Sequence, residues 1–393
     1  MGDVAGPVIP SYRGDMLSAV LPGAARALGL DLGLPAIALP ECRGVCVVLV
    51  DGLGARLLQE VAEDGGADAP FLSELLRAER PPGCPAQLRV GCPTTTAASM
   101  ASLGTGLPPG QHGLVGYEVL DPDRGALLNE LRWDPFTDPV VWQPLPTVFG
   151  RCVSADIEVT RIGDPEFDGS GLTIAAHRGG AFVGVAPLAD RVQAAVDALT
   201  TGRRALVYLY WGKVDGAGHQ HGWRGPAWRA ELRGVDAALS DLARRLPAGT
   251  ALVITADHGM VDVPHSERLD LADAPALRDG IALLGGEARF VQLYCRPGRA
   301  GAVAARMADA VGDRAWVRTR AEAIAQGWFG PVSDRVRPRI GDVLVAARGS
   351  FAIVDRMVTR RHMLSLIGQH GSLTEDEQLV PLLIAAGGRP GRV

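Results

Sequence analysis

Short apolar runs alternate along the chain with longer segments in which apolar positions recur every three or four residues. The runs are rich in Val, Leu and Ile, each ends in a polar cluster, and they occupy residues 46–50, 205–210, 251–255 and 381–386. Such runs predict buried strands of a largely parallel sheet. Helix candidates lie between them, at residues 95–103, 188–199 and 228–246. The alternation predicts an α/β fold, with helices packed on a mostly parallel central sheet.

The pattern changes in the last third of the chain. Apolar segments at residues 290–295, 315–318, 343–346 and 351–354 surround one helix-like stretch at residues 300–311. We interpret residues 262–365 as a smaller α+β insertion, and residues 1–261 with 366–393 as the main unit. Residues 118–200, rich in Pro, Asp and Gly, are expected to form a loop-rich excursion that makes one wall of a pocket.

Composition narrows the possible functions. The 393 residues are 47% hydrophobic and 21% charged, which is ordinary for a globular protein, and the formal net charge is -5. Without polybasic character, a nucleic-acid polymer is a poorer partner than a small phosphate compound. No apolar run approaches the roughly 18–20 residues that cross a bilayer, and no signal-peptide pattern is evident. We therefore expect a soluble, cytoplasmic protein that does not bind membranes; the oligomeric state stays open.

Residues that could bind a metal or take part in catalysis follow three of the predicted strands. Asp51 comes directly after the first, Asp215 lies shortly after the second, and Asp257 and His258 follow the third. Open α/β sheets bind their ligands at the carboxyl ends of strands, so these side chains are expected to converge. Taken alone, Asp51 is equally well explained as a helix cap.

Carboxylates and imidazoles recur at spacings that suit metal binding. Asp215 and His219 are four residues apart, on one face if the segment is helical, although a surface charge pair would look the same. An adjacent Asp257 and His258 at the end of an apolar strand need polar partners there. His370 adds an imidazole between small residues. Oxygen and nitrogen donors of this kind suit zinc, or else manganese.

A hydroxyl-rich segment precedes one of the predicted helices. It reads Pro93-Thr94-Thr95-Thr96-Ala97-Ala98-Ser99 and is followed by Gly104-Thr105-Gly106-Leu107-Pro108-Pro109-Gly110-Gln111-His112-Gly113. Capping or packing explains most of these hydroxyls. A helix N-terminus also favours an oxyanion, so one threonine could act as a nucleophile if a divalent cation activates it.

The order of these motifs resembles the alkaline phosphatase superfamily, in particular its nucleotide pyrophosphatase/phosphodiesterase branch, from about residue 45 to 386. The family pattern PTxTFPN…TGxxPxxHG lines up without a gap on the hydroxyl-rich segment and selects Thr96 as the nucleophile. The resemblance implies an alkaline-phosphatase-like catalytic core with helices on both faces of the sheet. It also implies two divalent metals, one held by Asp51, Thr96, Asp257 and His258, and the other by Asp215, His219 and His370.

The resemblance further implies a two-metal phosphodiesterase that acts on small nucleotide diesters through a phosphothreonine. The blocks around Gly104, Gly327 and Gly368 are similar to actinobacterial phosphodiesterases that degrade cyclic di-AMP, which makes cyclic di-AMP and linear pApA the leading substrates. Where the family has a phosphate-contacting asparagine this chain has Tyr117, and Lys213, the only lysine, is a second candidate substrate contact. A phosphomonoesterase or phosphonate hydrolase, or a non-enzymatic nucleotide sensor, are the alternatives.

Overall fold

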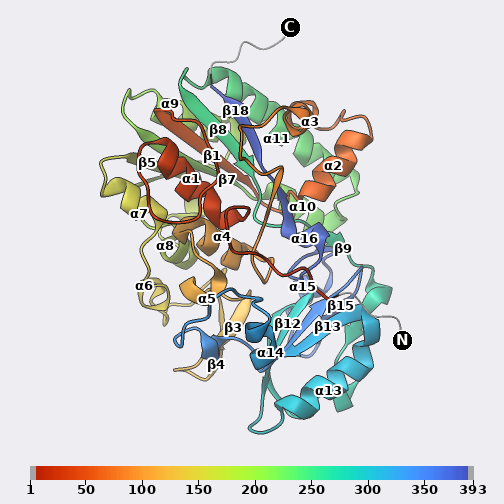
Figure 1. Ribbon diagram of the computed structural model, residues 1–393. Coiled ribbons are helices and arrows are strands. Elements are labelled where there is room, and N and C mark those ends of the chain that lie inside the picture. The colour runs from red at the N-terminus through yellow and green to blue at the C-terminus, as the bar shows by residue number, and fades with distance from the viewer. Residues whose placement is uncertain (1–5, 388–393) are drawn as a thin grey trace.

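The protein is described here as a computed structural model of residues 6–387 (Figure 1). The ends of the predicted main unit, residues 1–5 and 388–393, lie outside it. Its centre is a six-stranded sheet. In spatial order the strands are β18 (Leu383–Ala386), β8 (Thr250–Thr255), β1 (Gly44–Val50), β7 (Ala205–Trp211), β5 (Glu158–Gly163) and β6 (Ala181–Gly184).

The apolar runs form the middle of this sheet. Every residue of β1 and β8 is buried, as expected for strands covered on both faces. All neighbouring strands pair in parallel except β18, which runs antiparallel to β8. The α/β fold expected from the sequence is therefore confirmed. The last apolar run divides, because β17 (Leu379–Pro381) leaves the main sheet to pair with β2 (Gln87–Arg89).

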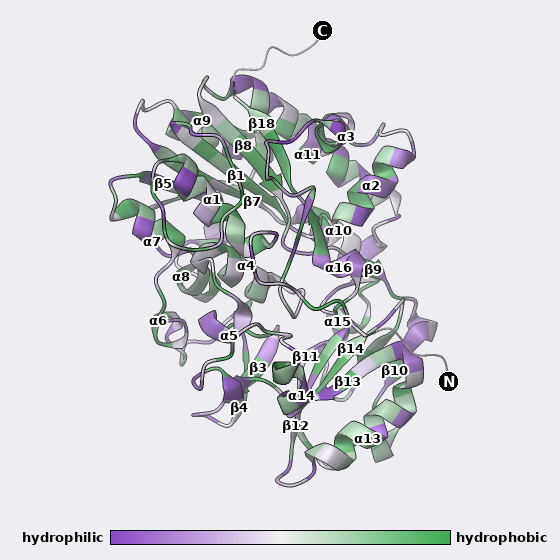
Figure 2. Cartoon of the chain, viewed as in Figure 1, coloured by the Kyte–Doolittle hydropathy of each residue, from purple (hydrophilic) through white to green (hydrophobic). Residues whose placement is uncertain are grey.

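Helices pack in two layers around the central sheet (Figure 1). One layer consists of α2 (Ala55–Glu63), α3 (Pro70–Arg77), α9 (Leu188–Leu199) and α11 (Pro226–Arg245). The other consists of α1 (Val20–Ala27), α4 (Thr96–Thr105), α7 (Val148–Val153) and α8 (Gly171–His177). Figure 2 shows apolar residues concentrated on the strands and polar residues on the outward parts of the helices.

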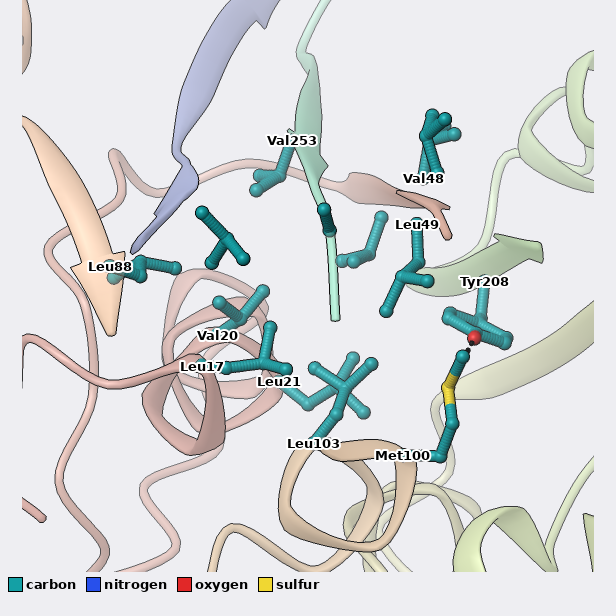
Figure 3. Packing of buried hydrophobic residues seen from close by; sticks show 14 of the residues in the cluster. Leu17, Val20, Leu21, Val48, Leu49, Leu88, Met100, Leu103, Tyr208 and Val253 are labelled. Carbon is teal, nitrogen blue, oxygen red and sulfur yellow. Dashed lines mark hydrogen bonds between the residues drawn. The ribbon is translucent and has the colours of Figure 1, made fainter. Parts of the chain in front are cut away.

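Helix α4 is held against the sheet by apolar packing. Figure 3 shows Leu103 and Met100 on α4 facing Leu49 and Tyr208 on the strands, with Leu21 of α1 beside them. The Tyr208 hydroxyl also donates a hydrogen bond to Met100 Sδ at 3.3 Å. This packing fixes the helix so that its N-terminus lies near the carboxyl ends of the strands.

The expectation of a loop-rich excursion over residues 118–200 is wrong in part, because β5 and β6 belong to the central sheet. Strand β6 lies at the edge of the sheet and has no buried residue, whereas β5 lies beside it and is interrupted by half-buried Glu158 and Thr160. An edge strand does not need a continuous apolar run, so its sequence carries little strand signal. The remainder of the stretch contains the hairpin β3 (Glu118–Asp121) and β4 (Ala126–Asn129), and the short helix α6 (Pro139–Trp142).

A second, antiparallel sheet has a hydrophobic cluster of its own. Its strands in spatial order are β11 (Ile281–Glu287), β12 (Phe290–Cys295), β14 (Val343–Ala347) and β13 (Ala315–Thr319). Helix α13 (Ala300–Val311) packs on it. We propose that residues 262–365 form a subdomain around this sheet and that residues 1–261 and 366–393 form the catalytic core.

The remaining elements are short and mostly connect the two sheets. They are α5 (Pro109–His112), α10 (Lys213–His221), β9 (Val261–Asp262), β10 (Arg268–Asp270), α12 (Pro275–Arg278), α14 (Arg320–Ala325), β15 (Ala352–Val354), α15 (Arg361–Leu364), β16 (Gly368–Gln369) and α16 (Glu375–Gln378), together with the 3-10 turns Leu17–Ala19, Pro165–Phe167, His265–Glu267, Gly312–Arg314 and Arg337–Arg339. Between residues 6 and 387, no helix is both long enough and apolar enough to span a bilayer.

Candidate metal centre and nucleophile

Three adjacent strands bring acidic side chains to one edge of the sheet. Asp51 follows β1, and Asp257 and His258 follow β8, which lies beside it. On the other side of β1, β7 leads through Gly212 into α10, whose first turn carries Asp215. Parallel strands end at the same edge, so residues about 200 positions apart in sequence become neighbours, as the sequence predicted.

Helix α10 presents two of the predicted ligands on one face. Asp215 and His219 are one turn apart, and His219 Nε2 lies 3.2 Å from Asp215 Oδ2. The turn after β1 approaches this helix closely. Gly52 has a φ of +73°, and a Cβ there would lie 2.9 Å from Asp215 Oδ1. Only glycine fits this left-handed turn without displacing the carboxylate.

Thr96 is the first residue of α4, and its Oγ1 lies 3.3 Å from His258 Nε2. The two preceding threonines do not cap the helix. Thr94 Oγ1 donates to the Ser372 carbonyl at 2.9 Å, and Thr95 Oγ1 donates to Glu287 Oε2 at 3.2 Å. Thr96 thus keeps its hydroxyl directed at the cluster, beside the free N–H groups of a helix N-terminus.

The three histidines share one hydrogen-bonding arrangement. Nδ1 of His219, His258 and His370 lies 2.7, 2.9 and 2.9 Å from the carbonyl oxygens of Gly368, Gly259 and Thr94. A carbonyl can only accept, so each Nδ1 must carry the proton. In the neutral ring Nε2 then keeps its lone pair, which is the state of a histidine that binds a metal.

The potential ligand atoms fall into two groups. One contains Asp215, His219 and His370, the other Asp51, Asp215 and His258, and within each group the atoms lie within 4.8 Å of one another. Asp215 belongs to both. The rings of His258 and His370 stack 3.6 Å apart, so protonating both would place two positive charges in contact. Burial, and then repulsion by His258, lowers the pKa of His370 well below its usual value.

Unpaired carboxylate oxygens show that the cluster fits cations. Asp51 Oδ1, Asp215 Oδ1 and Asp257 Oδ2 are buried and have no hydrogen-bond partner in the described part of the chain. Burial raises the pKa of Asp51, and repulsion by Asp257 and Asp215 adds to the effect. Burial also raises the pKa of Asp257. Uncompensated buried charge is costly, and divalent cations bound between these oxygens and the Nε2 atoms would remove the cost.

Asp215 and His219 form an ion pair. Burial alone would raise the pKa of Asp215, but the charge and hydrogen bond of His219 outweigh it and lower the pKa. For His219, burial would lower the pKa, but Asp215 outweighs it and raises the pKa to about 9. Protonated His219 therefore compensates part of the negative charge of the neighbouring carboxylates.

Glu287, on the second sheet, is a site residue that the sequence did not reveal. Its side chain is 10% exposed, and Oε2 lies 3.5 Å from His370 Nδ1. Oε1 is buried without a partner, and burial raises the pKa of the carboxyl well above its usual value. A single acidic residue after Gly285 and Gly286 belongs to no metal-binding spacing, so only the fold brings it to the site.

Two cavities open beside Thr96. The larger, of about 610 Å³, and the smaller, of about 390 Å³, share Thr96, Leu131, Arg132 and Asp215 in their linings. Tyr117 lines the smaller cavity, consistent with a substrate contact. Lys213 is exposed, its Nζ lies 5.2 Å from the centroid of a Trp211 ring, and it lines neither cavity. A substrate contact by Lys213 stays a prediction.

Solved structures similar to this chain have the same fold. An inactive variant of murine ectonucleotide pyrophosphatase/phosphodiesterase 5 in complex with AMP is 18% identical, with 88% of each chain covered and a TM-score of 0.69. The human protein of that name is 19% identical, with 87% of each chain covered and the same TM-score. Phosphonoacetate hydrolase from Sinorhizobium meliloti, in complex with phosphonoformate, is 21% identical and covers 88% of this chain and 90% of its own, with a TM-score of 0.65.

The sequence itself matches a family model over most of its length. The family is described as "Type I phosphodiesterase / nucleotide pyrophosphatase", and the match covers residues 45–372. The matched range includes the strand ends, the hydroxyl-rich segment and the three histidines of the cluster, His219, His258 and His370. The chain therefore belongs to the type I phosphodiesterase/nucleotide pyrophosphatase family, a branch of the alkaline phosphatase superfamily, and is a phosphoester hydrolase.

Proposed function

We propose that this hydrolase cleaves small nucleotide phosphodiesters with the aid of two divalent metal ions, through a phosphothreonine at Thr96. One observation carries the proposal. The Thr96 hydroxyl lies at the N-terminus of α4, 3.3 Å from His258 Nε2, beside buried carboxylates with unpaired oxygens and where both cavities meet. The hydroxyl that would attack phosphorus therefore lies next to the side chains that would bind the activating metal, with space for a substrate group on either side.

The residues divide between two ions as the family resemblance implies. Asp51, Thr96, Asp257 and His258 would hold one, and Asp215, His219 and His370 the other. Bound there, divalent cations would lower the pKa of the Thr96 hydroxyl and neutralise charge that develops on the leaving oxygen. The mixed oxygen and nitrogen donors suit zinc first and manganese second. Asp215, which lies in both groups, would couple the two positions.

The chain's own residues account for the order of events. Thr96 Oγ1 gives its proton to solvent and forms a bond to phosphorus in line with the scissile bond. The bond from phosphorus to one alcohol arm of the diester breaks, and that oxygen takes up a proton from solvent as it leaves. The free backbone N–H groups of the first turn of α4 would donate hydrogen bonds to the phosphoryl oxygens. Water then attacks the phosphothreonine and releases a monophosphate. Two displacements give net retention at phosphorus.

The cavities support a diester with a sizeable group on each side of the phosphorus. Volumes of about 610 and 390 Å³ are within the range of small-molecule sites. The murine relative was solved with AMP, which supports a nucleotide as one of those groups. Cyclic di-AMP and its linear product pApA are therefore the first substrates to assay, in keeping with the actinobacterial resemblance. We place the reaction in the cytoplasm, where such nucleotides occur.

A phosphomonoesterase or phosphonate hydrolase is the second candidate, favoured by the shared fold with phosphonoacetate hydrolase. Parallel assays with bis-p-nitrophenyl phosphate, p-nitrophenyl phosphate and phosphonoacetate separate the three activities. We expect the diester to be turned over fastest, since both cavities then hold part of the substrate. A large preference for the monoester or the phosphonate would overturn the diesterase proposal.

Replacing Thr96 tests the nucleophile. We expect Thr96→Ala to abolish turnover of bis-p-nitrophenyl phosphate, and Thr96→Ser, which keeps a hydroxyl, to retain measurable activity. Acid quenching of the wild-type enzyme during turnover, followed by peptide mass spectrometry, should find phosphate on Thr96. Full activity of the alanine variant, or phosphate on another residue, would exclude this mechanism.

A further inference from the structure

The wall of the larger cavity contains a buried cation without a counter-ion. Arg161, on β5, is only 9% exposed, and its guanidinium makes one hydrogen bond, from Nη2 to the Gly180 carbonyl at 3.3 Å. Its Nε is buried and has no partner. Among residues 6–387, no carboxylate lies within 4.0 Å of the Arg161 guanidinium, although Glu166 lines the same cavity.

The other buried arginines in the described part of the chain each have an ion pair or several hydrogen bonds, although Nε of Arg339 is also unpaired. Arg191 lies 2.6 Å from Asp164, and Arg289 lies 2.7 Å from Glu377. Arg339 donates three hydrogen bonds to the carbonyls of Gly113 and Trp142. Burying a guanidinium without such partners raises the free energy of the folded protein, because the charge loses its hydration. An anionic ligand would compensate that charge. Arg161 alone among these four lines a cavity that also contains Thr96.

A second unpaired arginine borders the same space. Arg132 lines both cavities and is exposed, and its side chain has no hydrogen bond or ion pair to any described residue. Aromatic rings complete the wall, with Phe182 5.6 Å from the Arg161 guanidinium and Phe167 5.8 Å from the Tyr210 ring. The cavity therefore suits a group that has a planar ring and a negative charge.

We propose that Arg161, assisted by Arg132, binds a second phosphate of the substrate, distinct from the one that Thr96 attacks. This inference rests on the proposed diesterase function and narrows its substrate to dinucleotides with a phosphate in addition to the scissile one. Linear pApA carries such a group, whereas ApA, the same dinucleotide without its 5′-phosphate, does not. Guanidinium groups pair bidentately with phosphate, which gives the subsite its preference.

Binding without turnover tests the subsite. In the Thr96→Ala protein, calorimetry should show pApA bound at least about tenfold more tightly than ApA, because charge-assisted hydrogen bonds to the extra phosphate are strong. Adding Arg161→Gln should bring the two affinities close together. Adding Arg178→Gln should leave the ratio unchanged, because Arg178 is half-buried, donates only to carbonyls and lines neither cavity. Equal affinities in the Thr96→Ala protein would overturn the proposal, as would an unchanged ratio after Arg161→Gln.

Two further measurements keep the outcomes distinct. If Arg161→Gln does not fold, Arg132→Gln, an exposed change, should still reduce the pApA/ApA ratio, and no reduction would count against the proposal. Hydrolysis of bis-p-nitrophenyl phosphate by the wild-type enzyme tests the diesterase function separately, since that ester has one phosphate. A preference for pApA without diester hydrolysis would retain the subsite and reject the proposed reaction.

Discussion

Each buried carboxylate of the site has one oxygen bound to the protein and one left free. Asp51 Oδ2 accepts a hydrogen bond from the Tyr210 hydroxyl at 2.5 Å, and Asp257 Oδ1 accepts one from the Gly52 N–H at 3.1 Å. The other oxygens, Asp51 Oδ1 and Asp257 Oδ2, are unpaired. These hydrogen bonds hold the carboxylates in position before any ion arrives, so little reorganisation is needed on binding.

Buried His112 predicts a loss of stability in acid. Its Nδ1 accepts from the Leu114 N–H at 3.1 Å, so the neutral ring carries its proton on Nε2, 3.0 Å from Ser102 Oγ. Burial, and then Arg335 and Arg339, lowers its pKa to about 3. Below pH ~6.5 the His112 ring becomes protonated in the unfolded chain but stays neutral in the folded protein. The free energy of unfolding therefore falls as the pH falls.

Urea unfolding at pH 7 and pH 5, with EDTA present, measures this effect. The wild-type free energy of unfolding should fall by about 2 kcal/mol more than that of His112→Gln over this range. Taking the difference between the two proteins removes the contribution of the other titrating groups to the pH dependence. An equal fall in both would show that His112 is protonated in the folded state.

The contact between the turn after β1 and helix α10 sets the spacing of Asp51 and Asp215. Gly52 requires its positive φ and has no room for a Cβ. Gly216, next to Asp215 on α10, has nothing within 4 Å of its Cβ position. Two neighbouring glycines therefore have different roles.

We expect Gly52→Ala to reduce kcat by at least about tenfold and to destabilise the protein by roughly 1–3 kcal/mol, because the new methyl group strains the turn and displaces Asp215. Gly216→Ala should preserve activity and raise stability by up to about 1 kcal/mol, since alanine favours a helix. Diester hydrolysis and thermal unfolding of both variants check this. A fully active Gly52→Ala enzyme would show that the turn does not position the carboxylates.

The elements that the sequence predicted well are those that the fold buries on both faces. The runs that became β1, β7 and β8 could be recognised because nearly every position is apolar, and the ends of β1 and β8 located Asp51 and Asp257. Strand β5 was missed because Glu158, Thr160 and Arg161 interrupt its apolar positions, and the role of Arg161 was missed with it. Glu287 was missed because its proximity to His370 depends on the docking of two sheets, which no local pattern encodes.

Across the whole molecule, negative charge accumulates at one point. Three buried carboxylates meet there, on a chain whose net charge is -5. Ions that bind only the folded state stabilise it by mass action. Metal binding and global stability should therefore be linked.

Removing metal with EDTA should lower the thermal midpoint, and adding zinc or manganese should restore it. At a hundredfold excess over the dissociation constant, each ion contributes about 2.7 kcal/mol. Asp215→Asn should lose most of the response because Asp215 belongs to both ligand groups, whereas His219→Gln should lose only part. Calorimetric melting and metal analysis of the three proteins provide the check. A midpoint indifferent to metal in the wild type would argue against a two-metal site.

The proposed metal ligands are spread from Asp51 to His370, and the last of them follows the second sheet. A nascent chain still lacking its final stretch would have the nucleophile but only part of the second ligand group. It could not complete the site, however well its first strands had folded. Catalysis should therefore begin only after synthesis has passed His370 and β16 has paired with β9. Because of this order of motifs, an incompletely synthesised chain would not hydrolyse the cell's nucleotides.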